Sequence, residues 1–283
     1  MNSASNAAPV SVIIPCFRCA ATIGRAVDSV FRQTYPPVEV ILVDDASSDG
    51  TFGILMELKN RYPEQVKIVS MIENVGAASA RNAGWIMASQ PYIAFLDADD
   101  AWRAEKLQIQ CSYMVSHPEI VLCGHQWIMI DADSKATDIS EKWVKTQVNP
   151  RHALFKNPFA TSTIMVVRDI PFRFEEKMRS AEDWLLWLRI TLAELSAVRL
   201  EVPLGYVYKA LYGSDGLSRN LWRMEKGELF CLATLYREGS INWLLFGSSV
   251  FFSMLKFFRR VVNVHIMRRL TGVNLSLLGS NKP

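Results

Sequence analysis

The chain has 283 residues, of which 50% are hydrophobic and 21% are charged, and its formal net charge is +3. A chain of this length can bury one large core, or one core and a small appendage, and its composition excludes a protein that is disordered throughout. The small net charge also argues against a nucleic-acid-binding protein, because such proteins usually carry a strong basic surplus.

Strand and helix signals alternate through the first hundred residues. Short apolar runs predict strands, and segments with apolar residues at helical spacing, ended by proline or turn residues, predict helices. This rhythm is typical of βαβ units, so we predict an α/β fold with a mainly parallel sheet flanked by helices. The predicted strands cover residues 10–15, 38–43, 66–71 and 92–96, and the predicted helices cover 21–33, 51–62 and 77–89.

The pattern is less regular after residue 100. It shows no internal repeat and no low-complexity segment. The predicted elements are helices over 105–116 and 181–195, strands over 161–168 and 205–208, one or two strands over 120–130, a polar connector over 131–150 and a mainly helical segment over 221–270.

The cysteines indicate a reducing compartment. Their odd number and wide scatter argue against a disulfide framework, and free thiols are typical of the cytoplasm. Cys16 and Cys19 match the CxxC pattern, for which we favour buried thiols over a redox motif. The cysteines are Cys16, Cys19, Cys111, Cys123 and Cys231.

Two acidic clusters follow predicted strands. Asp44-Asp45 comes after the second strand, and Asp97-Ala98-Asp99-Asp100 comes after the fourth. Ligands of such sheets bind in the crevice outside the carboxyl ends of the strands, so we expect both clusters to line one crevice. Three carboxylates in four residues suit a Mg²⁺ or Mn²⁺ ion that also contacts phosphate oxygens. The alternative is a pair of polar turns that cap the following helices.

Two helix starts carry further candidates. Gly76 precedes the helix that contains Arg81, and glycine at a helix start allows close approach of an anion. Glu182-Asp183 opens a very apolar helix, where an Asp beside large aromatic side chains could act as a general base. Each pattern also has a plainer explanation, namely a solvated surface arginine and two acids that complement the helix dipole.

The order and spacing of these motifs resemble those of the family 2 inverting glycosyltransferases, which have the GT-A fold. The resemblance covers about residues 10–215. The motifs are Val12-Ile-Ile-Pro15, Val43-Asp-Asp45, Ser48-Asp-Gly-Thr51, Asn74-Val-Gly76, Ala80-Arg-Asn-Ala-Gly84, Phe95-Leu-Asp-Ala-Asp-Asp100 and Glu182-Asp-Trp184.

The resemblance implies a role for each matching residue. Asp99 would reach a Mn²⁺ or Mg²⁺ ion that bridges the donor diphosphate. Asp183 would be the general base that deprotonates the acceptor hydroxyl, so that a single displacement inverts the anomeric centre. The residues expected around a UDP-sugar are Pro15, Phe17, Asp44, Asp45, Gly76, Arg81, Asp97, Ala98, Asp99 and Glu182.

The chain also departs from the family pattern. Arg18 stands where many relatives have Asn, and could contact the donor or an acceptor phosphate. The QxxRW motif of processive polysaccharide synthases is missing from the sequence, and so are multiple spanning helices, which favours addition of a single sugar. Lys209, Ser218 and Arg219 follow the last predicted strand as candidates for phosphate contact.

The C-terminal segment combines aromatic clusters with basic pairs. Its stretch of residues 241–255 carries no charge and is shorter than the ~20 residues that a spanning helix needs. Aromatic side chains beside Arg259-Arg260 and Arg268-Arg269 suit a helix in a membrane interface, with packing on the catalytic domain or in a dimer as the alternative. We therefore expect peripheral attachment to the cytoplasmic face of the cell membrane and a glycan or lipid-linked acceptor.

These expectations divide the chain into four parts: a flexible N-terminus at 1–9, a nucleotide-sugar-binding half at 10–125, an acceptor-binding half with the base at 126–219, and a helical extension at 220–283. Two rival functions remain. A nucleotidyltransferase of sugar phosphates usually has a Gly-rich basic loop after its first strand, which this chain lacks. A non-catalytic membrane-associated interaction protein would not need Asp99 or Asp183.

Overall fold

The chain folds into two units, Met1–Lys209 and Ala210–Pro283. A computed structural model describes residues 7–129, 144–208 and 221–271, with side chains as far as residue 263. The finer division of the chain at residue 125 stays a prediction, and one continuous sheet runs through both predicted halves of the first unit.

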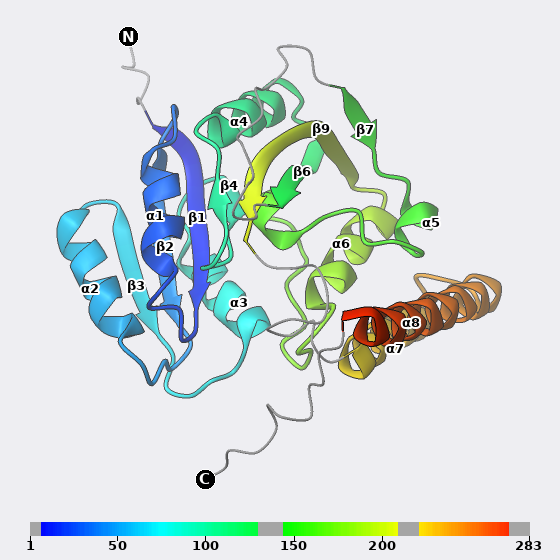
Figure 1. The fold of residues 1–283 in the computed structure, drawn as a ribbon. Coiled ribbons are helices and arrows are strands. Elements are labelled where there is room, and N and C mark those ends of the chain that lie inside the picture. Colours follow the sequence, from blue (N-terminus) through cyan, green and yellow to red (C-terminus); the bar gives the residue numbers. More distant parts are fainter. Residues whose placement is uncertain (1–6, 130–143, 209–220, 272–283) are drawn as a thin grey trace. The chain divides into compact units, whose positions relative to one another are not determined.

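The first unit is built on a mixed sheet with the strand order β3-β2-β1-β4-β8-β6-β9-β5, and β7 pairs with β9 (Figure 1). The strands β3, β2, β1 and β4 are parallel, as the βαβ rhythm predicts. Beyond β4 the pairings are antiparallel, except that β6 and β9 are parallel. The strands are β1 Ala8–Cys16, β2 Pro37–Asp44, β3 Val66–Ser70, β4 Tyr92–Phe95, β5 Ala101–Trp102, β6 Ile120–Met129, β7 Lys145–Gln147, β8 Met165–Val167 and β9 Ser196–Val207.

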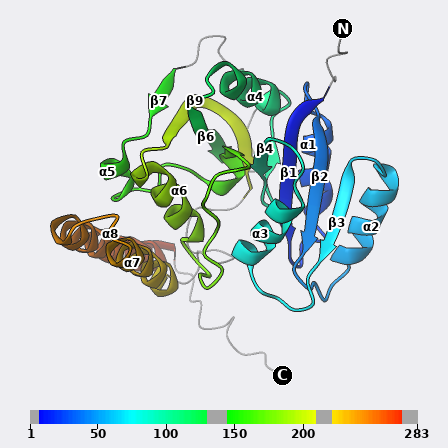
Figure 2. The same cartoon turned by 180° about the vertical axis from the view of Figure 1, so that it is seen from behind.

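Helices cover both faces of this sheet (Figures 1 and 2). Side chains of α1, α2 and α4 belong to one buried cluster, and side chains of α3 and α6 belong to the other. Alternate residues of β1 enter the two clusters, with Val12 and Ile14 in the first and Ile13 in the second, because successive strand side chains point to opposite faces. The helices are α1 Ile23–Phe31, α2 Thr51–Arg61, α3 Ala77–Met87, α4 Lys106–Ser116, α5 Pro150–Ala153, the 3₁₀ turn η1 Thr161–Thr163, and α6 Glu182–Leu192.

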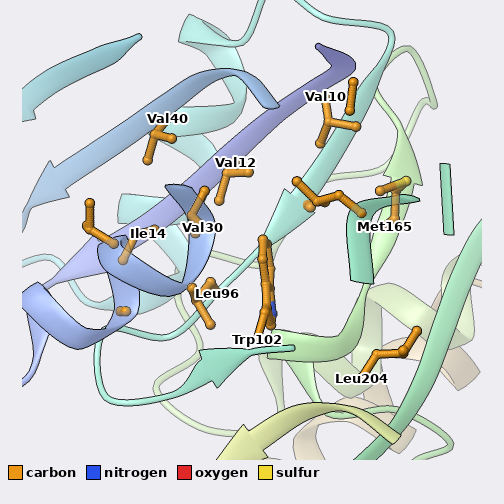
Figure 3. Close-up of a cluster of buried hydrophobic side chains, with 14 of the residues drawn as sticks. Val10, Val12, Ile14, Val30, Val40, Leu96, Trp102, Met165 and Leu204 are labelled. Atoms are coloured by element: carbon orange, nitrogen blue, oxygen red, sulfur yellow. The ribbon is translucent and has the colours of Figure 1, made fainter. Parts of the chain in front are cut away.

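Figure 3 shows part of the first cluster. Val12 of β1 lies beside Val30 of α1 and Val40 of β2, and Trp102 stands next to Leu96. All five side chains are at most 4% exposed. At about 25 cal/mol per Å² of buried apolar surface, this burial is the main favourable contribution to folding. The rigid sheet that results fixes the ends of the strands, from which the candidate site residues project.

A buried carboxylate fixes the strand register at the opposite end of the sheet. Glu39 of β2 accepts hydrogen bonds from the hydroxyl groups of Ser11 (2.6 Å) and Ser89 (2.8 Å) and from the backbone N–H of Ser89 (2.7 Å). It also pairs with Lys67 of β3. Since Ser11 lies on β1, a single side chain ties three neighbouring strands and the end of α3 together.

A buried lysine lies in the same unit without an acceptor. Lys106 is 0% exposed, and its Nζ has no hydrogen-bond partner among the described residues. Burial holds the pKa of Lys106 well below its usual range. His125 is also buried, and burial together with nearby Lys106 lowers its pKa to about 3. The Lys106 ammonium lies over the Trp102 ring, whose centroid is 3.7 Å away.

Three predicted elements differ from the structure. One is the polar connector predicted at 131–150, whose described part contains the strand β7. The strand predicted at 205–208 is the end of the 12-residue strand β9, whose earlier part contains Arg199, Glu201 and Pro203 between buried residues. This alternation indicates a strand, but proline and charged residues hide it in a search for apolar runs. The strand predicted at 161–168 is a 3₁₀ turn followed by the three-residue strand β8.

The second unit contains a helical hairpin of α7 Leu221–Arg237 and α8 Trp243–Thr271. Ion pairs join the two helices. Arg260 lies 3.1 Å from a Glu225 oxygen and 2.9 Å from a Glu228 oxygen, and Lys256 donates to Glu228 at 3.1 Å. The Ser253 hydroxyl also lies within 2.9 Å of both glutamates. Because these residues are spaced three or four apart, one face of α8 pairs with α7.

The opposite face of α8 is apolar and exposed. Leucine, phenylalanine and valine side chains recur there at helical spacing, so they form a single stripe. We call it the apolar stripe, and its residues are Leu244, Phe251, Leu255, Phe258 and Val262, each 49–67% exposed. Within the described residues, no helix is both long enough and apolar enough to cross a membrane.

Candidate active site

The acidic loop after β4 is held by neighbouring side chains. Arg81 donates to the Asp97 carboxylate at 2.8 Å, and the Ser162 hydroxyl donates to the Asp100 carboxylate at 2.6 Å. Ser162 also accepts a hydrogen bond from the backbone N–H of Asp97 at 3.1 Å. Between these residues, Ala98 is 8% exposed, whereas Asp99 is partly exposed. Arg81 and Ser162 therefore hold the carboxylates of Asp97 and Asp100, and Asp99 is partly exposed.

Arg81 connects this loop to the second acidic motif. It projects from α3, is 5% exposed, and donates to Glu182 at 3.0 Å as well as to Asp97. Burial alone would lower the pKa of Arg81, but the charges of Asp97 and Glu182 outweigh burial and raise it. Arg81 is thus a permanently charged bridge between two acidic motifs, rather than the solvated side chain of the plainer explanation.

Asp183 is the second residue of α6 and follows Glu182. Before them, Ala181 has a left-handed backbone conformation (φ 59°). The Asp183 carboxylate accepts hydrogen bonds from the backbone N–H of Trp184 (2.7 Å), the Asn157 amide (3.2 Å) and the Thr161 hydroxyl (3.3 Å). Burial and the neighbouring Glu182 charge raise the pKa of Asp183 to about 6, against the lowering effect of Arg81. A carboxylate with this pKa is ionised at neutral pH and is a stronger base than an ordinary Asp.

The aspartates after β2 have different surroundings. The Asp45 carboxylate accepts from the backbone N–H groups of Val75 and Gly76, both at 2.8 Å, and from the Asn74 amide at 2.9 Å. The Asp44 carboxylate accepts from the backbone N–H of Ser47 at 3.3 Å. Both residues are buried. Asp45 therefore fixes the loop before α3, which places this loop beside the end of β2.

Gly76 has a positive φ of 93°, which a residue with a side chain rarely adopts. A Cβ on Gly76 would lie 2.3 Å from a guanidinium nitrogen of Arg179. The two guanidinium nitrogens of Arg179 also donate to the Asn74 side chain and backbone at 3.3 Å each. The space that glycine leaves open here is thus filled by Arg179, which the sequence analysis did not single out.

The loop after β1 carries the first motif. Pro15 is partly exposed and lies one residue before the end of β1. The last residue of β1, Cys16, pairs with Asp44 of β2, so this loop lies at the same sheet edge as Asp44. Phe17 is 44% exposed, and the Arg18 guanidinium lies 5.2 Å from its ring centroid. Arg18 also donates to the Ser48 hydroxyl at 3.0 Å. The loop therefore presents one aromatic and one cationic side chain.

All five cysteines are free and buried, as expected. Cys16 and Cys19 interact through their thiols. This contact, together with burial, raises the pKa of Cys16. The same contact lowers the pKa of Cys19 against the opposing effect of burial.

The described residues contain no group of three His, Cys, Asp or Glu side chains that could hold a metal ion alone. This agrees with the pairing of Asp97 to Arg81 and of Asp100 to Ser162. Mg²⁺ is often held by one or two carboxylates together with substrate phosphates and water. Asp99, partly exposed in the loop after β4, fits such a shared ion.

Some predicted residues lie outside the described part of the chain, and some site residues were not predicted. Lys209, Ser218 and Arg219 fall in the segment 209–220, which the structure does not describe. Asn157 and Ser162 were missed. The only sequence signal for them is a short polar cluster, Asn157 and Thr161-Ser162-Thr163, between apolar residues.

Residues 11–173 match the family model described as Glycosyl transferase family 2. The chain belongs to this family. Over 232 residues it is 29% identical to the putative teichuronic acid biosynthesis glycosyltransferase TuaG of Bacillus subtilis, covering 81% of this chain and 87% of TuaG. Over 182 residues it is 33% identical to an Escherichia coli protein, WfgD, covering 64% of this chain and 69% of WfgD. WfgD is named a UDP-Glc:α-D-GlcNAc-diphosphoundecaprenol β-1,3-glucosyltransferase.

A solved structure agrees on the fold. The mannosyltransferase PcManGT from Pyrobaculum calidifontis, solved in complex with GDP-Man and Mn²⁺, aligns with a TM-score of 0.65 at 18% identity. The alignment covers 86% of this chain and 69% of that one. The fold of the glycosyltransferase described here is therefore GT-A, with the helical C-terminal extension that the sequence predicts.

Proposed function

We propose that this family 2 glycosyltransferase transfers a single sugar from a UDP-sugar to a glycan or lipid-linked acceptor, with inversion at the anomeric carbon. The observation that carries the proposal is the position of Arg81, which lies within hydrogen-bond distance of both Asp97 and Glu182. This bridge brings the acidic loop after β4 close to the start of α6. The proposed donor-binding motif and the proposed base would therefore belong to one site.

Asp183 is the proposed base. It would accept the proton of the acceptor hydroxyl as the oxygen attacks the anomeric carbon, while the bond to the UDP oxygen breaks on the opposite face of the sugar. The raised pKa of Asp183 and the hydrogen bonds from Asn157 and Thr161 support this role, because they suit and orient a carboxylate for proton transfer. Glu182, tied to Arg81, raises the basicity of Asp183.

The UDP moiety is proposed to bind along the ends of β1, β2 and β4. Pro15, Phe17, Asp44 and Asp45 would line the uridine, with the Gly76 loop and Arg81 beside them. Asp97 and Ala98 would lie near the ribose. Asp99 would hold a Mn²⁺ or Mg²⁺ ion, whose charge would offset the negative charge of the leaving diphosphate. Mn²⁺ in the PcManGT complex supports this ion, although that donor is GDP-Man.

The relatives suggest the substrate class. WfgD takes UDP-Glc and an acceptor on a diphosphoundecaprenol lipid, and TuaG is named for teichuronic acid biosynthesis. We infer by analogy that this chain extends a surface glycan on a lipid diphosphate carrier. A cytoplasmic enzyme at the membrane would meet such an acceptor, and the free thiols favour that compartment.

Peripheral membrane attachment is proposed for the second unit. The apolar stripe of α8 would lie in the membrane interface, and exposed Arg259 would approach anionic headgroups. Lys256 and Arg260 would contribute little to this attraction, because both pair with glutamates of α7. The apolar stripe would therefore contribute more to attachment than the net charge.

The experiment that tests the function measures UDP release from a panel of UDP-sugars with a synthetic GlcNAc-diphosphate-lipid acceptor. We expect one UDP-sugar to react with Mn²⁺ or Mg²⁺, EDTA to abolish transfer, and product NMR to show an inverted anomeric centre. Asp99→Ala should lose donor binding that depends on metal. Full activity of Asp99→Ala in chelator, or retention at the anomeric centre, would contradict the proposal. Formation of a nucleotide-sugar with pyrophosphate would instead favour a nucleotidyltransferase.

A further inference from the structure

One ridge of α1 contacts the acidic loop and the segment that follows it. Arg25 and Ser29 lie four residues apart on the same side of α1, and Gln33 follows four residues later, just after the helix ends. All three form hydrogen bonds with backbone groups of residues 99–107 rather than with side chains. α1 and Gln33 thus hold the main chain of that segment at three points.

Two of the three contacts belong to the scaffold. The Ser29 hydroxyl accepts from the backbone N–H of Trp102 at 3.0 Å. The Gln33 amide donates to the Arg103 carbonyl at 2.7 Å and accepts from the backbone N–H of Leu107 at 2.8 Å. Gln33 is 6% exposed, and Trp102 is 4% exposed and belongs to the core cluster. These contacts anchor the far end of the segment.

Arg25 differs from the other two because it is exposed and contacts the site residue itself. Its guanidinium donates to the backbone carbonyl of Asp99 at 2.6 Å. The same guanidinium lies 3.8 Å from the ring centroid of Tyr208, which follows β9. Tyr208 is 38% exposed. The planar guanidinium is therefore held between the Asp99 carbonyl in the loop after β4 and the Tyr208 ring just after β9.

We propose that Arg25 is a positioning residue for Asp99, and that Tyr208 keeps the Arg25 guanidinium in place. The carbonyl that Arg25 holds belongs to Asp99, so this hydrogen bond restricts the peptide plane and with it the direction of the Asp99 carboxylate. Groups that orient a metal ligand typically change metal affinity by about 10- to 100-fold when removed. The inference rests on the proposed role of Asp99 toward a divalent ion.

The chemistry of arginine explains why the residue type matters. A guanidinium can stack on an aromatic ring and donate in its plane at the same time. Lysine keeps the charge but loses the planar stack, and alanine loses both contacts. A residue that contributed only general positive potential would be replaced by lysine without loss, whereas a positioning residue would not.

The test measures UDP binding by calorimetry, with and without Mn²⁺, in the full chain and its variants. We expect Arg25→Ala to weaken Mn²⁺-dependent UDP binding roughly tenfold, at the low end of the range for groups that orient metal ligands, and to leave metal-free UDP binding unchanged. Arg25→Lys and Tyr208→Leu should each give a smaller loss of the same kind. Arg32→Ala is the matched control, since Arg32 is an exposed arginine at the end of the same helix.

Asp99→Asn separates the two proposals. If Asp99→Asn abolishes the Mn²⁺ effect while Arg25→Ala, Arg25→Lys and Tyr208→Leu behave like Arg32→Ala, the positioning role is wrong and the metal role of Asp99 stands. If Asp99→Asn leaves the Mn²⁺ effect intact, the metal role fails and the inference fails with it. If Arg25→Ala loses metal-free and Mn²⁺-dependent UDP binding equally, the variant has lost structure in general, and Tyr208→Leu decides. The inference stands if Tyr208→Leu weakens only the Mn²⁺-dependent binding, and it is overturned otherwise.

Discussion

Arg81 and Glu182 lie 101 positions apart in the sequence, and their side chains meet at 3.0 Å in the interior of the first unit. Arg81 is 5% exposed and Glu182 is 9% exposed, so water screens the ion pair little. The same guanidinium reaches Asp97 of the acidic loop. The geometry of the candidate donor site and that of the candidate base therefore depend on one side chain.

Removing the Arg81 charge should destabilise the fold. Arg81→Gln leaves two carboxylates without a partner, and breaking a buried pair typically costs about 3–5 kcal/mol. We expect a value near the lower limit, because the Asp97 side chain is 37% exposed. Denaturant unfolding measures this change, and UDP binding should weaken with it.

Matched variants distinguish a charge effect from a packing effect at Arg81. Arg61→Gln, in an exposed pair with Asp28, should change the free energy of unfolding by less than about 1 kcal/mol. Adding Glu182→Gln to Arg81→Gln should recover part of the lost stability. If Arg81→Gln is as stable as Arg61→Gln, the bridge between the two acidic motifs contributes nothing.

Replacing Asp183 should abolish proton transfer without loss of donor binding. Asp183→Asn keeps the size of the side chain but cannot accept the proton, so turnover should fall about 10²- to 10⁴-fold. UDP affinity should stay close to that of the wild type. In the wild type, turnover should rise with pH through about 6, because only the ionised carboxylate is a base. A drop in turnover of less than threefold would mean that the base lies elsewhere.

The same residue should make stability depend on pH. The pKa of Asp183 rises from an ordinary 3.8 to about 6 in the fold, so the folded state binds the proton more tightly than the unfolded chain. The wild type therefore loses stability as pH rises from about 4 to 6, and Asp183→Asn does not. The difference in free energy of unfolding between the two should grow by about 2 to 3 kcal/mol over that range. A constant difference would contradict the raised pKa.

Lys106 should be a site where an apolar residue stabilises the protein. Its contact with the Trp102 ring is worth about 2 kcal/mol when desolvated, which is less than the cost of burying an ammonium that has no acceptor. Lys106→Met should therefore raise the free energy of unfolding at pH 7, by about 1–4 kcal/mol if it resembles replacement of buried ion pairs.

The sign of the pH effect follows from the lowered pKa of Lys106. The unfolded chain binds the proton below the ordinary pKa of about 10.4, so the wild type gains stability as pH rises toward that value. The advantage of Lys106→Met should shrink accordingly between pH 7 and pH 10. Exposed Lys156→Met is the control. A less stable Lys106→Met at pH 7 would reveal a favourable role for the amine.

The apolar stripe should determine membrane binding. The double variant Phe251→Ser and Phe258→Ser should reduce flotation with anionic liposomes, whereas Phe52→Ser, an exposed phenylalanine of α2, should not. Because two cations of α8 pair with α7, flotation should fall only modestly when salt is raised. Wild type that stays at the bottom of the gradient at low salt would exclude the membrane role, and a dimer in light scattering would assign the stripe to a second copy.

The sequence predicts the elements of the first hundred residues well because the signal for each element is local. Each strand from β1 to β4 is followed or preceded by a helix that covers it, and apolar runs of four to eight residues mark these buried strands. β9 was predicted only at its end, because its charged residues alternate with buried ones and Pro203 interrupts the run. β7, a three-residue strand with three exposed side chains, has no apolar signal at all.

Prediction of the candidate site from the sequence is limited in the same way. Asp97, Asp99 and Asp183 are visible in the sequence, since acidic residues after a strand or at a helix start are conspicuous. The partners that orient them are not visible. Ser162, Asn157 and Arg25 are common polar residues, and only the fold brings Ser162 to Asp100 or Arg25 to the Asp99 carbonyl. A sequence can indicate which groups react, whereas their orientation depends on contacts between distant segments.

The hydrogen bond between Ser11 and Glu39 has a consequence for the opposite end of the sheet. On β2, Glu39 precedes Asp44 by five residues, or about 16 Å of strand. If β1 slipped by one residue along β2, Ser11 would turn to the other face and leave the buried Glu39 charge with fewer donors, at a cost of about 1–3 kcal/mol. Such a slip would also shift Cys16 past Asp44 by about 3.3 Å. The Glu39 carboxylate, at the other end of β2, thus helps to fix the register of the two strands whose loops are proposed to bind the nucleotide.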